Sequence, residues 1–198
     1  MQNSRPDASK EAEWIRRCQA GEKEAFTPLV DAYQRRVFSI AFHLVRRRND
    51  VEDIVQEIFM KAFAAIESYN FQSSFGTWLN RIAVNHCYDY LRRQRSSRVT
   101  YYWEMSEEGQ REIESHSRSP EEGGLNSEEK LALGDLVTKL LARAPAEDRV
   151  ILTLKEIEDK SVDEISEILG LKLSTVKVRL HRARKRMVKD LQKWQEGR

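Results

Sequence analysis

Residues 160–189 restrict the fold more than any other segment, because they predict two short helices joined by a tight turn. Ser161 followed by Glu164 is a capping box, which marks the start of a helix. Gly170 can adopt the left-handed conformation that ends this helix, and Ser174 is predicted as the N-cap of the next one. Apolar residues recur at helical spacing on one face of each helix: Val162, Ile165, Ile168 and Leu169 in the first, and Val176, Leu180, Ala183 and Met187 in the second.

After Lys160, the positive charge in this segment lies only beyond Gly170, in the turn and the second helix. Residues 171–189 contain eight Lys or Arg and no Asp or Glu, whereas the first helix carries Asp163, Glu164 and Glu167. Two such helices could also be a plain packing unit with a solvated basic face. The sorting of charge between the two helices favours a helix-turn-helix whose second helix enters the DNA major groove.

The rest of the chain also shows helical periodicity. Apolar residues at steps of three and four predict helices over residues 8–20, 24–45, 50–66, 75–94, 128–141 and 146–156. Residues 96–127 lack this period and are polar and acidic, a composition that cannot bury enough apolar surface to fold alone. We therefore predict an all-α protein with a helical domain over residues 8–95, a flexible acidic linker over 96–127 and a second helical domain over 128–194.

Composition narrows the possible functions. The formal net charge of +2 hides the local basic helix, so it does not argue against nucleic-acid binding. Cys18 and Cys87 lack metal-ligand spacing and are expected to be free thiols in a reducing cytoplasm. The sequence has no signal-peptide core and no apolar run of membrane-spanning length, so a cytoplasmic location is expected. We expect no metal and no cofactor.

The helix predicted over residues 50–66 begins with a row of acids and amides. Asp50 is its predicted N-cap, and Glu52, Asp53, Gln56 and Glu57 lie beside the apolar stripe. Acidic side chains favour a helix N-terminus because they complement the helix dipole, so a solvated helix start would explain them. The alternative is a docking face for a basic partner.

The helix predicted over residues 75–94 combines aromatic, amide and basic side chains. Phe71, Phe75 and Trp78 gather near its start, and Asn85 follows. Aromatic faces suit unstacked bases, amides suit base edges and arginines suit phosphates, so the pattern favours single-stranded nucleic acid. Phe75 and Trp78 could instead be core residues. Packing explains the remaining polar residues less easily: Arg81, Asp89, Arg92 and Arg93.

Two stretches of the first domain, followed by the helix-turn-helix, resemble a known family. The stretches are DVEDIVQEIFMKAFAAIESYN (residues 50–70) and SSFGTWLNRIAVNHCYDYLRR (residues 73–93). In this order and spacing they resemble bacterial RNA polymerase sigma factors of the extracytoplasmic-function (ECF) group of the sigma-70 family. The resemblance covers about residues 20–95 and 128–190.

The resemblance implies a role for each part of the first domain, which would be sigma region 2. The acidic row would grip the clamp helices of the polymerase β′ subunit through Asp50, Glu52, Asp53, Gln56 and Glu57. The following helix would recognise and open the −10 promoter element, with a flipped base held near Asn85. The residues implied there are Phe75, Trp78, Arg81, Asn85, Asp89, Arg92 and Arg93.

The second domain would be sigma region 4, which would read the −35 element and touch the polymerase β flap. Lys177, Val178, His181 and Arg182 lie opposite the buried stripe and would meet bases. Ser174 and Thr175 would set the helix N-terminus on a phosphate. The cations expected at phosphates are Arg179, Arg184, Lys185 and Arg186. Members of this family are usually controlled by an anti-sigma factor, which the acidic linker could bind.

Two other functions compete with this one. A stand-alone helix-turn-helix regulator would need a sensing or dimerisation domain, which the acidic row and the Trp78–Asn85 pattern fit poorly. An enzyme acting on nucleic acid would need metal ligands or a positioned base, such as the His-x-Glu and paired cysteines of a deaminase. The sequence contains neither, nor a glycine-rich phosphate loop, so we predict a sigma factor without enzymatic activity of its own.

Overall fold

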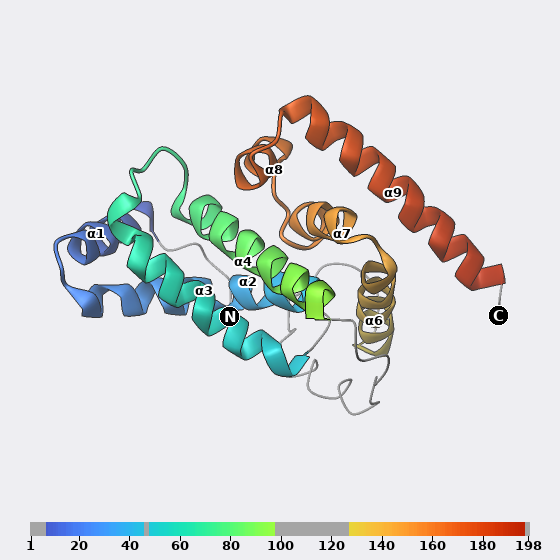
Figure 1. The fold of residues 1–198 in the computed structure, drawn as a ribbon, viewed down its shortest axis with the longest axis horizontal. Helices are drawn as coiled ribbons and strands as arrows, with labels where there is room; N and C mark the ends of the chain where they lie inside the picture. Colours follow the sequence, from blue (N-terminus) through green and yellow to red (C-terminus); the bar gives the residue numbers. More distant parts are fainter. Residues whose placement is uncertain (1–6, 46–47, 98–126, 197–198) are drawn as a thin grey trace. The chain divides into compact units, whose positions relative to one another are not determined.

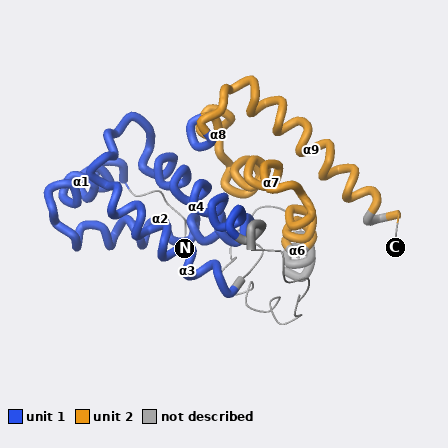
Figure 2. The backbone as a smooth tube through the Cα atoms, in the orientation of Figure 1, with its two compact units in different colours: residues 1–93, 167–169 blue, residues 94–166, 170–198 orange. Residues whose placement is uncertain are grey.

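The structure is a computed structural model that describes residues 7–45, 48–97 and 127–196, and every regular element in these ranges is helical (Figure 1). The predicted all-α class is therefore confirmed. Figure 2 colours two compact units, residues 1–93 with 167–169 and residues 94–166 with 170–198. We call the helices within residues 7–97 the first domain and those within 127–196 the second domain, and describe each by itself. Most of the predicted linker, residues 98–126, lies outside the described residues.

The first domain contains α1 (Ala8–Gln19), α2 (Thr27–Leu44), α3 (Val51–Ala65) and α4 (Phe75–Ser97). The prediction of one helix over residues 24–45 was wrong at its start, because Lys23–Phe26 form a separate 3₁₀ turn, η1. Pro28 lies in the first turn of α2, where its missing N–H leaves no hydrogen bond unmade. At the other end of the domain, α4 continues three residues beyond the predicted end at 94.

The predicted apolar faces of α2, α3 and α4 supply most of the core of the first domain. Gly76 lets α4 approach α2 closely, since a Cβ at this position would lie 3.1 Å from the Tyr33 ring. Each fully buried aliphatic side chain contributes roughly 1.5–3 kcal/mol to folding. The buried residues include Leu29, Val37, Ile40 and Leu44 of α2, Ile54, Ile58 and Ala62 of α3, and Leu79 and Ala83 of α4.

The second domain contains α6 (Ser127–Arg143), α7 (Ala146–Leu152), α8 (Val162–Leu169) and α9 (Leu173–Glu196). The helix predicted over residues 146–156 changes to a π-helical turn, η5 (Thr153–Ile157), after two turns. Helix α7 packs against α9, and apolar side chains of both helices are buried. The buried side chains include Val150, Ile151 and Leu152 of α7 and Val176, Leu180 and Ala183 of α9.

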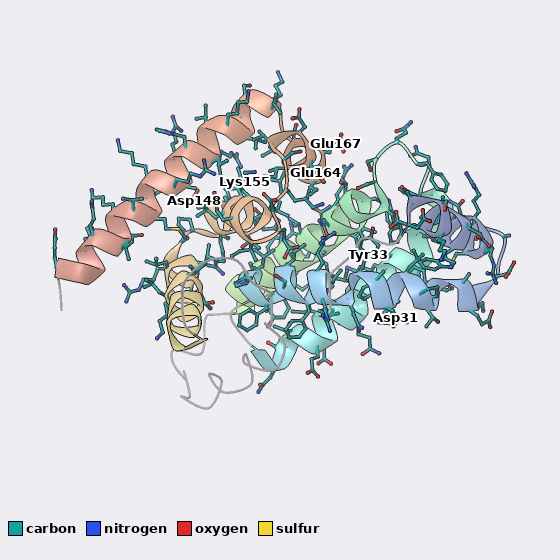
Figure 3. The ribbon with its side chains drawn as sticks, turned by 180° about the vertical axis from the view of Figure 1, so that it is seen from behind. Asp31, Tyr33, Asp148, Lys155, Glu164 and Glu167 are labelled. Atoms are coloured by element: carbon teal, nitrogen blue, oxygen red, sulfur yellow. The ribbon has the colours of Figure 1, made fainter. Side chains whose placement is uncertain are left out.

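The helix-turn-helix forms from α8 and α9, and its predicted capping box is confirmed. The Glu164 backbone N–H donates to Ser161 Oγ at 3.1 Å, and the Ser161 N–H donates to Glu164 Oε2 at 2.9 Å. Burial opposes ionisation of Glu164, but the Ser161 N–H and the Lys160 ammonium hold the pKa of Glu164 below its ordinary value. Figure 3 labels Glu164 at the start of α8.

The turn between α8 and α9 was predicted correctly at one of its two key residues. Gly170 adopts a φ of +62°, the left-handed conformation expected at the end of a helix. Ser174, however, is not the N-cap, because α9 already begins at Leu173 and the Val176 N–H donates to the Lys172 carbonyl at 3.1 Å. Across the described part of the chain, no helix has the length and apolar character needed to span a bilayer.

Candidate functional site

Helix α3 presents an exposed row of acids and amides. Glu52, Asp53, Gln56 and Glu57 are all exposed and lie on one side of α3, because positions i, i+1, i+4 and i+5 share a helix face. Met60 continues this row one turn further and is 56% exposed. Met60 was not predicted as part of this face, although it follows Gln56 by four residues, one turn of the helix. We call these five residues the acidic row.

Asp50 occupies a different position from the acidic row. It is the N-cap residue of α3, as predicted, but its side chain makes no capping hydrogen bond in the described structure. Its carboxylate instead accepts a short hydrogen bond from the Tyr90 hydroxyl of α4. Asp50 therefore joins the start of α3 to α4 and is half-buried, whereas the acidic row faces solvent.

A second link between α3 and α4 passes through His86. The imidazole is 4% exposed and lies between two α3 side chains, with Nε2 3.1 Å from Glu57 Oε2 and Nδ1 2.6 Å from Lys61 Nζ. Burial and the nearby Lys61 ammonium lower the pKa of His86, while Glu57 opposes this shift. The ring is therefore neutral near pH 7, and neither its sequence position nor any motif indicated this role.

Phe75 lies in the core of the first domain and not on a nucleic-acid surface. Its side chain is 1% exposed. Its ring centroid lies 5.4 Å from that of Tyr33, 5.7 Å from that of Tyr69 and 5.4 Å from that of Trp78. The core alternative left open by the sequence therefore holds for Phe75, whereas Trp78 is half-buried at the edge of this aromatic cluster.

The remaining residues predicted for the −10 element share one side of α4. Arg81, Asn85, Arg92 and Arg93 are exposed, and Asp89 is half-buried. Asp89 Oδ1 lies 2.9 Å from Arg92 Nη2, so the carboxylate offsets part of the positive charge at this end of the helix. The structure thus brings these residues onto one solvent-facing surface.

The loop that leads into α4 exposes another aromatic ring. Phe71 is 42% exposed and has a φ of +62°, a conformation that costs a non-glycine residue about 1–2 kcal/mol. Its ring lies 4.8 Å from that of Tyr69, and the Arg16 guanidinium lies 5.5 Å from its centroid. The Tyr69 hydroxyl donates to the Ser73 carbonyl at 2.7 Å, and this hydrogen bond joins the two ends of the loop.

Helix α9 exposes nearly all of its predicted DNA-binding residues, but its cations fall into two groups. Three arginines pair with carboxylates of α7 and η5: Arg179 with Glu147 at 3.4 Å, Arg184 with Glu156 at 2.7 Å, and Arg186 with Asp148 at 2.7 Å. Figure 3 labels Asp148 on α7. These arginines were predicted to meet phosphates without regard to these carboxylates. The partners are distant in sequence: Glu156 lies 28 residues before Arg184, and Asp148 lies 38 residues before Arg186.

The second group of α9 side chains has no ion-pair partner among the described residues. Lys177, Arg182 and Lys185 belong to this group and are exposed. Three other residues predicted to meet the −35 element are also exposed: Ser174, Val178 and His181. Thr175, predicted to meet it as well, is half-buried. Within the described ranges, no three His, Cys, Asp or Glu side chains gather in a group that could hold a metal ion.

Comparisons with known proteins identify the family. Residues 29–97 match the family model for Sigma-70 region 2, and residues 135–187 match that for Sigma-70, region 4. The ECF RNA polymerase sigma factor SigW of Bacillus subtilis is 30% identical over 179 residues, covering 89% of this chain and 94% of the relative. The ECF RNA polymerase sigma-E factor of Haemophilus influenzae is 36% identical over 182 residues, covering 90% and 93%. The chain is an ECF sigma factor of the sigma-70 family.

Solved structures share the fold of this sigma factor. CnrH, solved in complex with the cytosolic domain of CnrY, has a TM-score of 0.66 at 24% identity, covering 94% of this chain and 98% of CnrH. The sigma factor RpoE of Bartonella quintana, solved with the anti-sigma factor NepR, has a TM-score of 0.63 at 23% identity, covering 84% and 96%. In this sigma factor the region 2 match contains the acidic row and the exposed side of α4, and the region 4 match contains the cations of α9 up to residue 187.

Proposed function

We propose that this sigma factor binds core RNA polymerase through the acidic row of α3, reads and opens the −10 element with α4, and reads the −35 element with α9. One observation carries the proposal: regions 2 and 4 both match in a single chain that aligns with ECF sigma factors over nearly their whole length. A stand-alone regulator would not need both. The factor would act in the cytoplasm and would need no cofactor or catalytic residues, since strand opening draws on binding energy.

Polymerase binding is assigned to the exposed carboxylates and amide of the acidic row. Glu52, Asp53 and Glu57 are exposed in the free protein, so a basic surface can reach their carboxylates. Glu57 also accepts a hydrogen bond from His86 but is still 51% exposed. The partner we propose is the β′ clamp helices. Asp50 would contribute indirectly, because its carboxylate is bonded to Tyr90 of α4.

Opening of the −10 element is assigned to the exposed side of α4 and the loop before it. Asn85 offers donors and an acceptor to a base edge, and the neighbouring arginines face phosphates. The exposed ring of Phe71 adds a stacking surface beside Trp78, which shares the Tyr69 cluster with it. Capture of an extruded base would offset an unstacking cost of a few kcal/mol. Phe75 would not touch DNA but would pack beneath Tyr69 and Trp78 in the core.

Reading of the −35 element can be divided between two exposed cations of α9. Replacing Arg182 by Ala should relax the sequence preference at one base pair by about 1–3 kcal/mol, because a bidentate base contact is lost. Replacing Lys185 by Ala should weaken binding evenly on all sequences, because a phosphate contact carries no sequence information. Binding of each holoenzyme to a set of single-base −35 variants measures both effects.

The matched control for these two variants is Arg184→Ala, which removes a cation already paired with Glu156. We expect this change to alter promoter binding less than Lys185→Ala does. Equal losses on every sequence for the Arg182 and Lys185 variants would contradict the proposed division of roles.

An anti-sigma factor is the regulatory partner that we propose. One structure of similar fold was solved with such a protein bound to its sigma factor. We expect the partner to cover the polymerase-binding and promoter-binding surfaces of the free factor.

Reconstitution tests the proposed function. The purified chain is mixed with bacterial core polymerase, and promoter fragments selected from genomic DNA are scored for run-off transcription. Transcription that depends on both the factor and a defined −35/−10 pair supports the proposal. Specific promoter binding by the chain alone, without polymerase association, would establish a stand-alone regulator instead.

A further inference from the structure

We propose that His86 is a positioning residue that keeps the Glu57 carboxylate apart from Lys61, so that Glu57 stays available to the polymerase. The inference rests on the proposed function, because it concerns the same acidic row. It assigns a role in polymerase binding to a buried residue of α4, the helix for which we propose −10 element recognition.

The sequence of α3 by itself favours a different arrangement. Glu57 and Lys61 are four residues apart with the glutamate nearer the N-terminus, which is the favoured orientation for a direct ion pair along a helix. Among the described residues the two do not pair with each other. Each reaches the His86 ring instead, at 3.1 Å for Glu57 and 2.6 Å for Lys61.

The donors and acceptors at this site determine the tautomer of the ring. A lysine ammonium can only donate hydrogen bonds, so His86 Nδ1 must be the acceptor and Nε2 must carry the proton. Nε2–H then donates to the Glu57 carboxylate. Burial disfavours a second proton on the ring most strongly, and the positive charges of Lys61 and Arg93 also disfavour it. Glu57 and Asp89 favour the second proton, but the pKa of His86 is still lowered.

A neutral ring between the two charges leaves most of the Glu57 charge uncompensated. The carboxylate accepts one hydrogen bond from the imidazole and its side chain is still 51% exposed. Without the ring, Lys61 can swing to Glu57 and neutralise it along the helix. The acidic row would then lose one charge toward a basic partner, although α3 itself would remain folded.

A double-mutant cycle on affinity for core polymerase tests this role. We expect His86→Ala to bind about fivefold more weakly, the scale of one partly exposed charge pair. Lys61→Ala added to His86→Ala should restore the affinity to within about twofold of Lys61→Ala alone, because the competing ammonium is gone. A simple loss of packing at His86 would not be rescued in this way.

His86→Gln provides the matched conservative variant. A glutamine can accept from Lys61 and donate to Glu57 but does not titrate, so it should bind polymerase like the wild type at pH 7.5. When the pH falls below the ordinary range of histidine, a proton on Nδ1 would expel Lys61 and create an imidazolium that neutralises Glu57. Wild-type affinity should therefore fall more than that of His86→Gln as the pH is lowered below about 6.5, the ordinary pKa of histidine.

Two outcomes would overturn the inference. One is unchanged polymerase affinity in His86→Ala, or no rescue by Lys61→Ala, with both variants folded as judged by thermal unfolding. The other is a ¹⁵N spectrum of the free chain that shows His86 protonated on Nδ1. Failure of the wild type to bind polymerase would instead reject the proposed function, and the ¹⁵N spectrum would still test the geometry at His86.

Discussion

Replacing Asp53 by Arg should abolish stable association with core RNA polymerase, with a loss in affinity of about a hundredfold or more. The side chain is exposed in the first turn of α3 and lies next to Glu52 in the acidic row. A reversed charge there would both remove an attraction and place a cation against the basic surface of the partner. Fluorescence titration of labelled factor with core polymerase measures the effect.

Glu67→Arg is the control for Asp53→Arg. It makes the same change in net charge on another exposed carboxylate of the first domain, in the 3₁₀ turn Ile66–Ser68 that follows α3. We expect polymerase affinity to change less than threefold for this control, because surface charges away from an interface act mainly through screened, long-range attraction. Equal losses in both variants would show that net charge, and not the acidic row, governs association.

Phe75→Ala should destabilise the first domain by about 3–5 kcal/mol, the cost of removing a large buried aromatic side chain. The ring is 1% exposed and touches Tyr33, Tyr69 and Trp78, so its removal leaves a cavity beneath the loop before α4. Thermal or denaturant unfolding of the purified chain measures the loss. The loss of promoter opening by Phe75→Ala should match the fraction of the protein that is unfolded.

Asn85→Ala is the matched variant for Phe75→Ala. Asn85 is exposed on the same helix, so its replacement should leave the unfolding transition within about 0.5 kcal/mol of the wild type. Permanganate footprinting of the −10 region should nevertheless show less strand opening. A Phe75→Ala protein that unfolds like the wild type but cannot open the −10 element would show that the ring does contact DNA.

The parts of the fold that could be predicted depend on signals within a few residues. Ser161 and Glu164 are three residues apart and bond to each other as a capping box requires, and Gly170 has the left-handed backbone that only glycine adopts without strain. The apolar faces of α2, α3 and α4 were likewise visible, because each repeats with the period of one helix. Local chemistry therefore predicted the helix-turn-helix and the all-α class.

Boundaries were less predictable because several residues nearby could have filled the same position. Ser174 is a good N-cap type, yet α9 begins two residues earlier than predicted, at Leu173. Residues 24–45 carry a continuous helical period, but Pro28 is best placed in a first turn, so α2 starts at Thr27. Periodicity cannot distinguish a helix from a 3₁₀ turn that joins it.

The contacts that organise the candidate site could not be predicted from spacing at all. His86 meets Lys61 across 25 residues, Tyr90 meets Asp50 across 40 and Arg186 meets Asp148 across 38. Each pair joins two helices whose packing no local pattern specifies. For the same reason Phe75 was predicted as a DNA contact, since its burial depends on Tyr33 and Tyr69 from other elements.

The pairing of arginines on α9 has a consequence for how salt affects promoter binding. Residues 171–189 carry eight Lys or Arg, but Arg179, Arg184 and Arg186 already have carboxylate neighbours, which leaves at most five cations to displace counterions from DNA. Each phosphate neutralised contributes about −0.9 to the slope of log K against log salt, so region 4 should show a slope near −4.5 at most, and not the value near −7 that its composition suggests. Binding of region 4 to the −35 element should therefore persist at ionic strengths that would dissociate a helix of the same length with eight unpaired cations.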